Sequence, residues 1–334
     1  MTNVFLDEFL KRYELTQDDI LAEIESAFGE QIALMATGSV VQGFANSDSD
    51  LDVVVCVESD RVSDFPVLAF RNGARIDVSF YSYTKFREQA RSLGAEWPPH
   101  STPMTRDAYV TRATAIAKVT RCALSAPLMI TSRWNELAPY LDAARLQSAT
   151  VAWWRVESFR RRVTSSWLVH AKPLLAAQKL CDAVFAALEL RSARAGYWYF
   201  EQKWLPEKLK LADDTPGLVA FRKALELPVR AEEVEVYFEA LRETLDQLLD
   251  GDEGDRLAVH LSLAPGVCLR EMGRLTQVSR WNMRAIEVAG LTLDDSEVIA
   301  EVPLDTTPSV QLLELASADL LWLGVGRKSN VRDS

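Results

Sequence analysis

Residues 38–52 read GSVVQGFANSDSDLD, and two apolar stretches flank them, QIALMAT at 31–37 and LDVVVCV at 51–57. Each stretch has the length and the composition of a buried strand. A Gly-Ser pair ends the first stretch, and the polar run NSDSD leads into the second. Because glycine and small polar residues favour turns, the sequence predicts a strand, a short turn or helix through Gly43, and a second strand that begins with aspartates.

The next stretch, VLAFRNGARIDVSFYS at 67–82, predicts a β-hairpin. The Asn-Gly pair at 72–73 is a preferred two-residue hairpin turn. Asp77 lies in the second arm, and Arg75 alternates onto the same side of that strand, where it could pair with an acid or reach a triphosphate. Three apolar residues alternate onto the opposite side: Ile76, Val78 and Phe80.

We expect three carboxylates to come together here: Asp50, Asp52 and Asp77. Asp50 and Asp52 share a strand face because they are two residues apart, and Asp77 joins them if its strand lies next to theirs. Close carboxylates repel one another and need a compensating cation. Hard oxygen ligands suit Mg²⁺ or Mn²⁺ rather than Zn²⁺. A pair of such ions can hold both the attacking and the leaving oxygen of a phosphoryl displacement.

The turn at Gly38 and Ser39 adds a second element to this pattern. Backbone N–H groups in such a turn, together with the serine hydroxyl, are available to polyphosphate oxygens. The paired aspartates begin ten residues further along the chain. A phosphate-binding turn next to a group of carboxylates is a workable site for nucleotidyl transfer.

This combination resembles the DNA polymerase β-like nucleotidyltransferase superfamily. The resemblance rests on LMATGS, DLDV and RIDVS, within about residues 30–82, and its local form looks most like small-molecule members such as aminoglycoside and lincosamide nucleotidyltransferases. It implies that Gly38 and Ser39 hold the nucleotide phosphates. It also implies that Asp50 and Asp52 bind two Mg²⁺ ions, and that Asp77 binds the ion nearer the acceptor and acts as general base.

The reaction implied by the resemblance is transfer of a nucleoside monophosphate to a hydroxyl of a small molecule, with release of pyrophosphate. AMP from ATP is the favoured donor group, and an antibiotic or a natural-product intermediate is the expected acceptor. Two alternatives stay open. One is nucleotidylation of a protein or a tRNA, and the other is a non-catalytic regulator that only binds nucleotide.

Residues further along the chain have a structural and a functional interpretation each. The aromatic cluster at 197–204 is interpreted either as core packing or as a surface that stacks on a base, with Lys203 binding phosphate. Small-molecule members of the superfamily place a lysine and an acid at the cleft, and Lys203 and Glu201 are the candidates here. The arginine run at 160–162 predicts a solvated or salt-bridged helix face, or else a phosphate-binding arginine.

Three other candidates favour structural roles. Asp48 is expected to be a solvated turn residue, and Cys56 a buried apolar residue rather than a nucleophile. The Trp pair at 153–154 is expected to pack between helices.

The fold class predicted is α+β, with a small mixed sheet followed by a mainly helical region. We predict a nucleotidyltransferase domain over 1–127, a helical substrate- and nucleotide-covering domain over 128–250, and a mostly helical extension of unassigned function over 251–334. The expected helices of the later regions are 132–147, 149–169, 173–195, 216–226, 231–249 and 264–275.

Two further helices are predicted before the first strand. The second is capped by Thr16 with Asp19 three residues later, and it ends at Gly29. Thr84 is expected to cap a helix that runs to about Leu93. The first helix carries an apolar stripe of Phe5, Phe9 and Leu10.

Composition limits the partners. The 334-residue chain has 37 Lys and Arg against 48 Asp and Glu, a net charge of −11, so long nucleic acid is a disfavoured partner. Its four cysteines are too far apart to suggest a zinc site or a disulfide framework. The sequence shows neither a signal peptide nor a transmembrane stretch, which predicts a cytoplasmic protein without a membrane partner. It leaves the oligomeric state open.

Overall fold

Contacts divide the protein into two compact units that interleave along the chain. The first unit comprises Met1–Ala95, Arg112–Thr150 and Trp198–Glu207, and the second comprises Glu96–Thr111, Val151–Tyr197 and Lys208–Ser334. The boundaries predicted at 127 and 250 do not coincide with this division. The computed structural model describes residues 3–28, 31–62, 66–98, 104–169, 171–249, 257–264, 266–280, 285–289, 298–302, 309–318 and 320–327.

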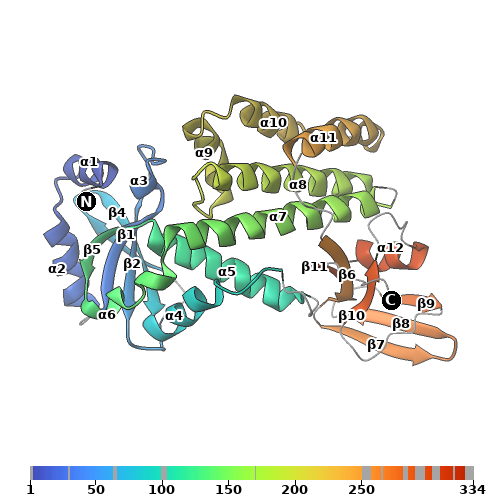
Figure 1. Ribbon diagram of the computed structural model, residues 1–334, viewed down its shortest axis with the longest axis horizontal. Helices are drawn as coiled ribbons and strands as arrows, with labels where there is room; N and C mark the ends of the chain where they lie inside the picture. The colour runs from blue at the N-terminus through green and yellow to red at the C-terminus, as the bar shows by residue number, and fades with distance from the viewer. Residues whose placement is uncertain are drawn as a thin grey trace, which may run out of the picture. The chain divides into compact units, whose positions relative to one another are not determined.

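The first unit is built on a five-stranded mixed sheet of order β3-β4-β2-β1-β5 (Figure 1). Strands β2 and β4 are parallel neighbours, and the other neighbouring pairs are antiparallel. The α+β class is therefore confirmed. The strands are β1 (Ala33–Thr37), β2 (Leu51–Val57), β3 (Val67–Arg71), β4 (Ala74–Ser82) and β5 (Ala126–Ile130).

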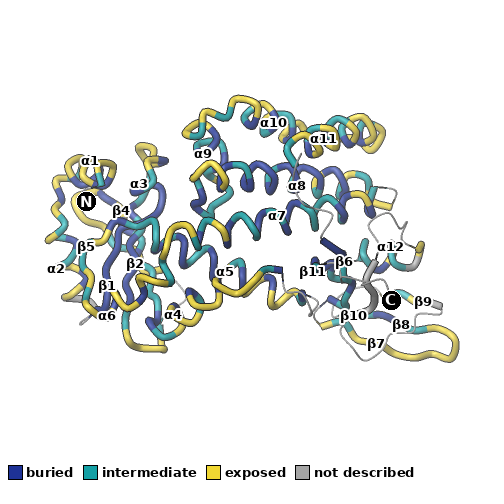
Figure 2. Tube along the Cα trace, viewed as in Figure 1, coloured by how far each residue is buried: buried dark blue, intermediate teal, exposed yellow. Residues whose placement is uncertain are grey.

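One face of this sheet carries the hydrophobic core. Alternate residues of β1, β2 and β4 pack there against α1 (Val4–Arg12) and α2 (Gln17–Phe28). The dark blue of β1 and β2 in Figure 2 marks their burial. Because strand side chains alternate, every second residue of β2 and β4 is left on the opposite face.

The predicted hairpin of β3 and β4 is confirmed. Its two turn residues have positive φ, 50° at Asn72 and 83° at Gly73, which is the conformation of a primed hairpin turn. In β4, Ile76 and Val78 belong to the core, while Asp77 lies on the other face, as the alternation predicts.

Helix caps agree in part with the sequence. Thr16 and Asp19 form the predicted capping pair, in which the Asp19 amide donates to Thr16 Oγ1 at 3.1 Å. Helix α4 (Tyr83–Ser92) is capped by Ser82 rather than Thr84, because the Lys85 amide donates to the Ser82 hydroxyl. The expected end of α2 at Gly29 lies outside the described residues.

The buried stripe of α1 also differs from the expectation. It consists of Leu6, Phe9 and Leu10. Phe5 is 46% exposed, and its ring lies against Gly43 rather than in the core.

The segment between the sheet and the long helices was predicted poorly. Residues 106–123 form the single helix α5 (Arg106–Ala123). The helix predicted at 149–169 is present but begins earlier, as the 26-residue helix α7 (Ala143–Leu168), and the separate helix predicted at 132–147 is wrong over most of its length. Pro139 lies in a short 3-10 turn, Ala138–Tyr140, and the earlier part of the segment is only the short α6 (Ser132–Asn135).

The following helices agree with the prediction to within a few residues. They are α8 (Pro173–Arg194), α10 (Thr215–Leu225) and α11 (Val234–Leu248). Two short elements, the 3-10 turn Gln202–Trp204 and α9 (Leu205–Leu211), were not predicted. Among the described residues, no helix combines the length and the apolar character that crossing a membrane requires.

The described residues of the C-terminal extension form mainly strands, so the prediction of a mostly helical extension is wrong for them. The helix expected at 264–275 is replaced by two antiparallel strands that reverse at Gly273, whose φ of 69° ends any helical pattern. Two three-stranded sheets, of order β10-β6-β11 and β7-β8-β9, occupy this region together with α12 (Val310–Ser317). The strands are β6 (Leu257–Leu263), β7 (Val267–Met272), β8 (Leu275–Arg280), β9 (Ile286–Ala289), β10 (Val298–Val302) and β11 (Leu321–Arg327).

Candidate active site

Gly38 and Asp52 form the centre of the site. Strand β1 ends at Thr37, which pairs with Asp52 of β2, and the short helix α3 (Gly38–Gln42) follows at once. Gly38 has a φ of 77°, and a Cβ atom at this position would overlap Asp52 Oδ2. Only glycine permits this approach, so the Asp52 carboxylate lies directly against the backbone of the Gly-Ser turn.

The other two aspartates lie beside Asp52. The parallel register of β2 and β4 pairs Asp52 with Asp77, and Asp50 immediately precedes β2. The Arg75 Nη2 atom lies 3.3 Å from Asp50 Oδ2 and 3.3 Å from Asp77 Oδ2. Asp52 and Asp77 therefore lie side by side in register, Asp50 lies two residues before Asp52, and Arg75 pairs with Asp50 and Asp77.

Arg75 takes the position of a counter-ion. The Asp50 and Asp77 side chains are 28% and 21% exposed, whereas Arg75 is 55% exposed. In the described part of the chain, no group of three or more His, Cys, Asp or Glu side chains is arranged so that it could hold a metal ion. In this conformation the Arg75 guanidinium bridges Asp50 and Asp77.

A second cation, Arg121, was missed in the sequence. It lies in the last turn of α5, where Thr37 Oγ1 donates to its carbonyl oxygen at 3.3 Å. Its own Nη2 donates to Glu201 Oε1 at 2.7 Å. The apolar period of Ile116, Val119 and Cys122 is the signal that predicts this helix, and the helix would have placed Arg121 in its last turn.

The segment 198–207 belongs to the same compact unit and brings Glu201 and Lys203 to this region. Phe44, just after α3, stacks on Trp204 with ring centroids 5.7 Å apart and contacts Tyr199 at 6.2 Å. Lys203 Nζ lies 5.5 Å from the centroid of the Trp204 ring. The two residues chosen from the helical region are therefore brought to the aspartates, and part of the aromatic cluster packs on the Gly-Ser turn.

The charges of the site act on one another. Burial raises the pKa of Asp52 above its ordinary value of 3.8; Arg121 and Lys203 lower that pKa, and Asp50 and Asp77 raise it. Burial lowers the pKa of Arg121, but interactions with Tyr199, Tyr81, Asp52 and Glu201 outweigh this and raise it. Arg121 is therefore a permanent cation next to a carboxylate that is costly to ionise.

The residues expected to be structural are structural. Asp48 is exposed, and its amide donates to Asn46 Oδ1 at 3.0 Å within the turn. Cys56 is fully buried, and burial together with Glu58 raises the pKa of its thiol to about 12, so it is not a nucleophile. In the second unit, Trp153 and Trp154 are buried, and Trp153 packs on Tyr109 at 4.1 Å.

Comparisons with known proteins give only distant structural likenesses. No protein-family profile and no curated protein matches the chain. Among solved structures, the chain is similar to a nucleotidyltransferase-like protein from Exiguobacterium sibiricum 255-15, with 12% sequence identity, a TM-score of 0.39, and coverage of 72% of this chain and 78% of that one. The likeness is distant, so conclusions about activity depend on the side chains of the site itself.

The contact between Gly38 and Asp52 predicts a stability difference between two glycine variants. Gly38→Ala and Gly73→Ala place the same residue at similar φ, 77° and 83°, but only the first meets other atoms within 4 Å. We expect Gly73→Ala to lower the free energy of unfolding by about 1 kcal/mol, and Gly38→Ala by about 1–3 kcal/mol more. Urea unfolding of both variants measures the difference, and equal losses would show that the contact imposes no constraint.

The raised pKa of Asp52 predicts that this carboxylate destabilises the fold at neutral pH. Between the unfolded pKa, near 3.8, and the higher folded pKa, the unfolded state loses its proton first, so stability falls as pH rises through this window. We expect Asp52→Asn to raise the melting temperature at pH 7, by about 2–4 °C for each kcal/mol gained. The gain should shrink as the pH is lowered toward 4.

Asp48→Asn is the matched control, since it makes the same chemical change on an exposed turn. It should leave the melting temperature unchanged. A loss of stability in Asp52→Asn at pH 7 would mean that pairing with Arg121 and Lys203 outweighs the cost of burial.

Proposed function

We propose that this protein is a nucleotidyltransferase that moves a nucleoside monophosphate, with AMP from ATP as the favoured group, to a hydroxyl of a small molecule. The observation that carries the proposal is the contact of Asp52 with the Gly38 backbone, with Asp77 in register beside it. The backbone N–H groups of the turn at Gly38 and Ser39 can donate to phosphate oxygens beside these carboxylates.

The two cations give this site its selectivity for a polyphosphate. Arg121 and Lys203 both act electrostatically on Asp52, and Arg121 is held by Glu201. Fixed positive groups beside a carboxylate cluster suit a substrate that carries several negative charges and needs them oriented. In this proposal Gly38 and Ser39 bind the phosphates, Lys203 and Arg121 neutralise them, and the aromatic side chains near Phe44 are available to a base.

The reaction is an in-line displacement at the α-phosphorus. The acceptor hydroxyl oxygen forms a bond to this phosphorus, and the bond from the phosphorus to the oxygen that bridges to the β-phosphate breaks. Pyrophosphate leaves with that electron pair, and the hydroxyl proton passes to the Asp77 carboxylate, which acts as general base. Asp50 and Asp52 would hold the divalent ions that orient the triphosphate.

The donor set fits a divalent cation, since all three side chains offer hard carboxylate oxygens. Mg²⁺, or Mn²⁺, when bound by Asp50, Asp52 and Asp77 would neutralise the charge that develops on the attacking and leaving oxygens. Arg75 would first have to leave its place between Asp50 and Asp77. It is more than half exposed, so its guanidinium can turn into solvent or toward a phosphate.

The acceptor is proposed to be the hydroxyl of an antibiotic or a natural-product intermediate. The support is the resemblance of the segment GSVVQGFANSDSDLD to the aminoglycoside- and lincosamide-type enzymes. The net charge of −11 also favours a small or cationic acceptor over a long nucleic acid.

A labelling experiment tests the proposal. Thermal shifts with ATP, GTP, CTP and UTP, each with and without Mg²⁺, first identify the nucleotide that stabilises the protein. That nucleotide, labelled at the α-phosphate or at the γ-phosphate, is then incubated with a panel of hydroxyl-bearing small molecules. We expect the α-label alone to reach an acceptor, and Asp52→Asn to lower this rate about 10²–10³-fold.

Asp48→Asn, the matched control, should transfer at the normal rate. Transfer of the γ-label would contradict nucleotidyl transfer. An α-label on protein or tRNA alone would move the acceptor to a macromolecule, and nucleotide binding without turnover would favour a regulator.

The position of Arg75 predicts competition with metal. In Arg75→Met, the guanidinium that bridges Asp50 and Asp77 is gone, so the carboxylates repel each other more and attract a cation more strongly. Without nucleotide, Mn²⁺ titrated by electron paramagnetic resonance should bind about tenfold more tightly than to wild type, equivalent to about 1.4 kcal/mol.

Arg71→Met is the control, because Arg71 lies on the same hairpin but pairs with Glu23 at 2.9 Å. Its Mn²⁺ affinity should equal that of wild type. Unchanged or weaker Mn²⁺ binding in Arg75→Met would show that Arg75 does not occupy the position of a metal ion.

A further inference from the structure

The second unit contains a cavity of about 390 Å³ between α7, α8, α12 and β11. This volume is in the range of small-molecule sites. Its apolar lining side chains include those of Trp167, Leu168, Leu175, Leu321 and Leu323. The polar groups that also line it come from Arg160, Thr164, Lys179, Ser317 and Trp322. The cavity is lined wholly by residues of this unit, and nothing in the proposed function uses it.

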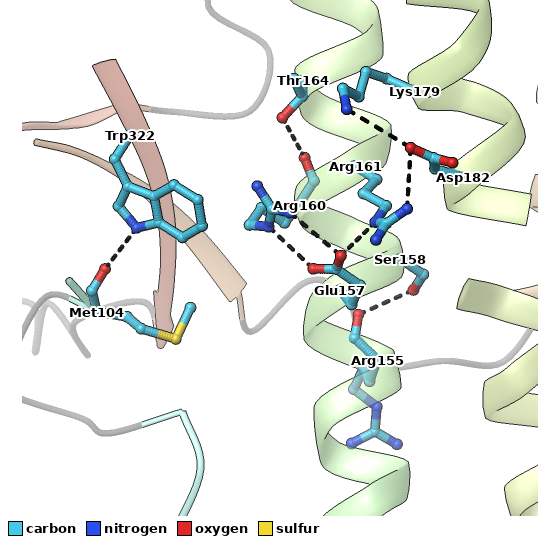
Figure 3. A network of polar contacts seen from close by, with 10 residues as sticks. All are labelled: Met104, Arg155, Glu157, Ser158, Arg160, Arg161, Thr164, Lys179, Asp182 and Trp322. Carbon is cyan, nitrogen blue, oxygen red and sulfur yellow. Dashed lines mark hydrogen bonds and ion pairs between the residues drawn. The ribbon is translucent and has the colours of Figure 1, made fainter. Parts of the chain in front are cut away.

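The lining contains two cationic side chains and no carboxylate. The acids that pair with these cations are Glu157 and Asp182, and neither lines the cavity. Glu157 accepts from Arg160 Nε at 3.0 Å and also pairs with Arg161, as Figure 3 shows. Asp182 accepts from Arg161 at 3.1 Å and lies 3.7 Å from Lys179.

This network carries an excess of positive charge. Burial raises the pKa of Glu157, but Arg160 and Arg161 outweigh it and hold that pKa below its ordinary value, so Glu157 is ionised. Three cations, Arg160, Arg161 and Lys179, thus face two carboxylates. This excess of positive charge lies at a cavity of mixed polar and apolar lining, in a chain whose net charge is −11.

The cationic wall is also held in place. The Arg160 guanidinium lies 4.7 Å from the Trp322 ring centroid and 5.1 Å from that of Tyr109. The Trp322 indole donates to the Met104 carbonyl at 3.2 Å, and Figure 3 shows it facing Arg160 across the space between α7 and β11. Because both neighbours of Arg160 are fixed, a ligand would not have to order this wall on binding.

We propose that this cavity binds a small organic monoanion, a carboxylate on an apolar body. Lys179, 36% exposed and only loosely paired, would bind the carboxylate together with Arg160, with the Thr164 hydroxyl nearby. The apolar body would lie against the leucines and Trp167. Arg160 is already paired with Glu157, so Lys179 is the lining cation with the weakest acidic pairing, which favours a monoanion over a phosphate dianion. The arginine run at 160–162 has the salt-bridged role predicted for it, with ion pairs to Glu157, Asp182 and Asp246.

Calorimetric titration with four probes of one chain length tests this proposal. Octanoate should bind, octanamide and octylammonium should bind at least about tenfold more weakly, and octyl phosphate should not exceed octanoate. Lys179→Met should weaken octanoate about tenfold or more and remove its advantage over octanamide. Lys210→Met, an exposed lysine on α9, is the matched control and should bind octanoate as wild type does.

Leu175→Trp fills the cavity without changing its charge and should abolish octanoate binding, which keeps the test decisive if Lys179→Met is unstable. Equal binding of octanoate and octanamide would overturn the proposal, as would normal octanoate binding by Leu175→Trp or no octanoate binding by wild type. Tighter binding of octyl phosphate would replace the carboxylate by a phosphate. None of these outcomes depends on nucleotidyl transfer, so the two proposals fail separately.

Discussion

The close approach of the Asp52 carboxylate to the Gly38 backbone is the constraint on which the first unit depends. It requires an antiparallel register that pairs Thr37 with Asp52 and a left-handed glycine directly after β1. The same strand β2 is also paired in parallel with β4, which fixes Asp77 beside Asp52. One strand thus positions the acidic centre from both of its edges, while its alternate residues fill the core.

This arrangement has an electrostatic cost that the surroundings only partly offset. Asp52 is shielded from water next to two more carboxylates, and its pKa is raised despite Arg121 and Lys203. Such uncompensated charge is common at functional sites, where a bound ligand can supply the missing opposite charge and some stability is given up for function. Arg75 supplies part of the missing positive charge, since its exposed guanidinium bridges Asp50 and Asp77.

A different balance organises the second unit. There a buried acid, Glu157, lies at the centre and gathers arginines around it, and an aromatic residue, Trp322, lies over one of them. Removing a buried charge without its partners is costly, so the acid and its arginines form one unit in energetic terms. Arg160 and Lys179 pair with acidic side chains, and the same two cations line the cavity.

Local sequence patterns were sufficient wherever a short segment determines its own conformation. The Asn-Gly turn at 72–73, the capping pair of Thr16 and Asp19, and the alternation around Asp77 were all predicted correctly, because each depends on neighbours within a few residues. The meeting of Asp50, Asp52 and Asp77 also followed from strand periodicity once their strands were neighbours.

Tertiary structure alone decided which distant side chains join the site. Arg121 and Lys203 are 82 residues apart in the sequence, and only packing of α5 and the 198–207 segment in one unit brings both into electrostatic reach of Asp52. The C-terminal strands were missed for a related reason, since a strand is stabilised by partners that can lie anywhere in the chain. Periodicity within 264–275 carries no information about the pairing of β7 with β8 or of β6 with β11. The sequence by itself determined the acidic motif and the local turns, and the long-range contacts determined the charges that surround them.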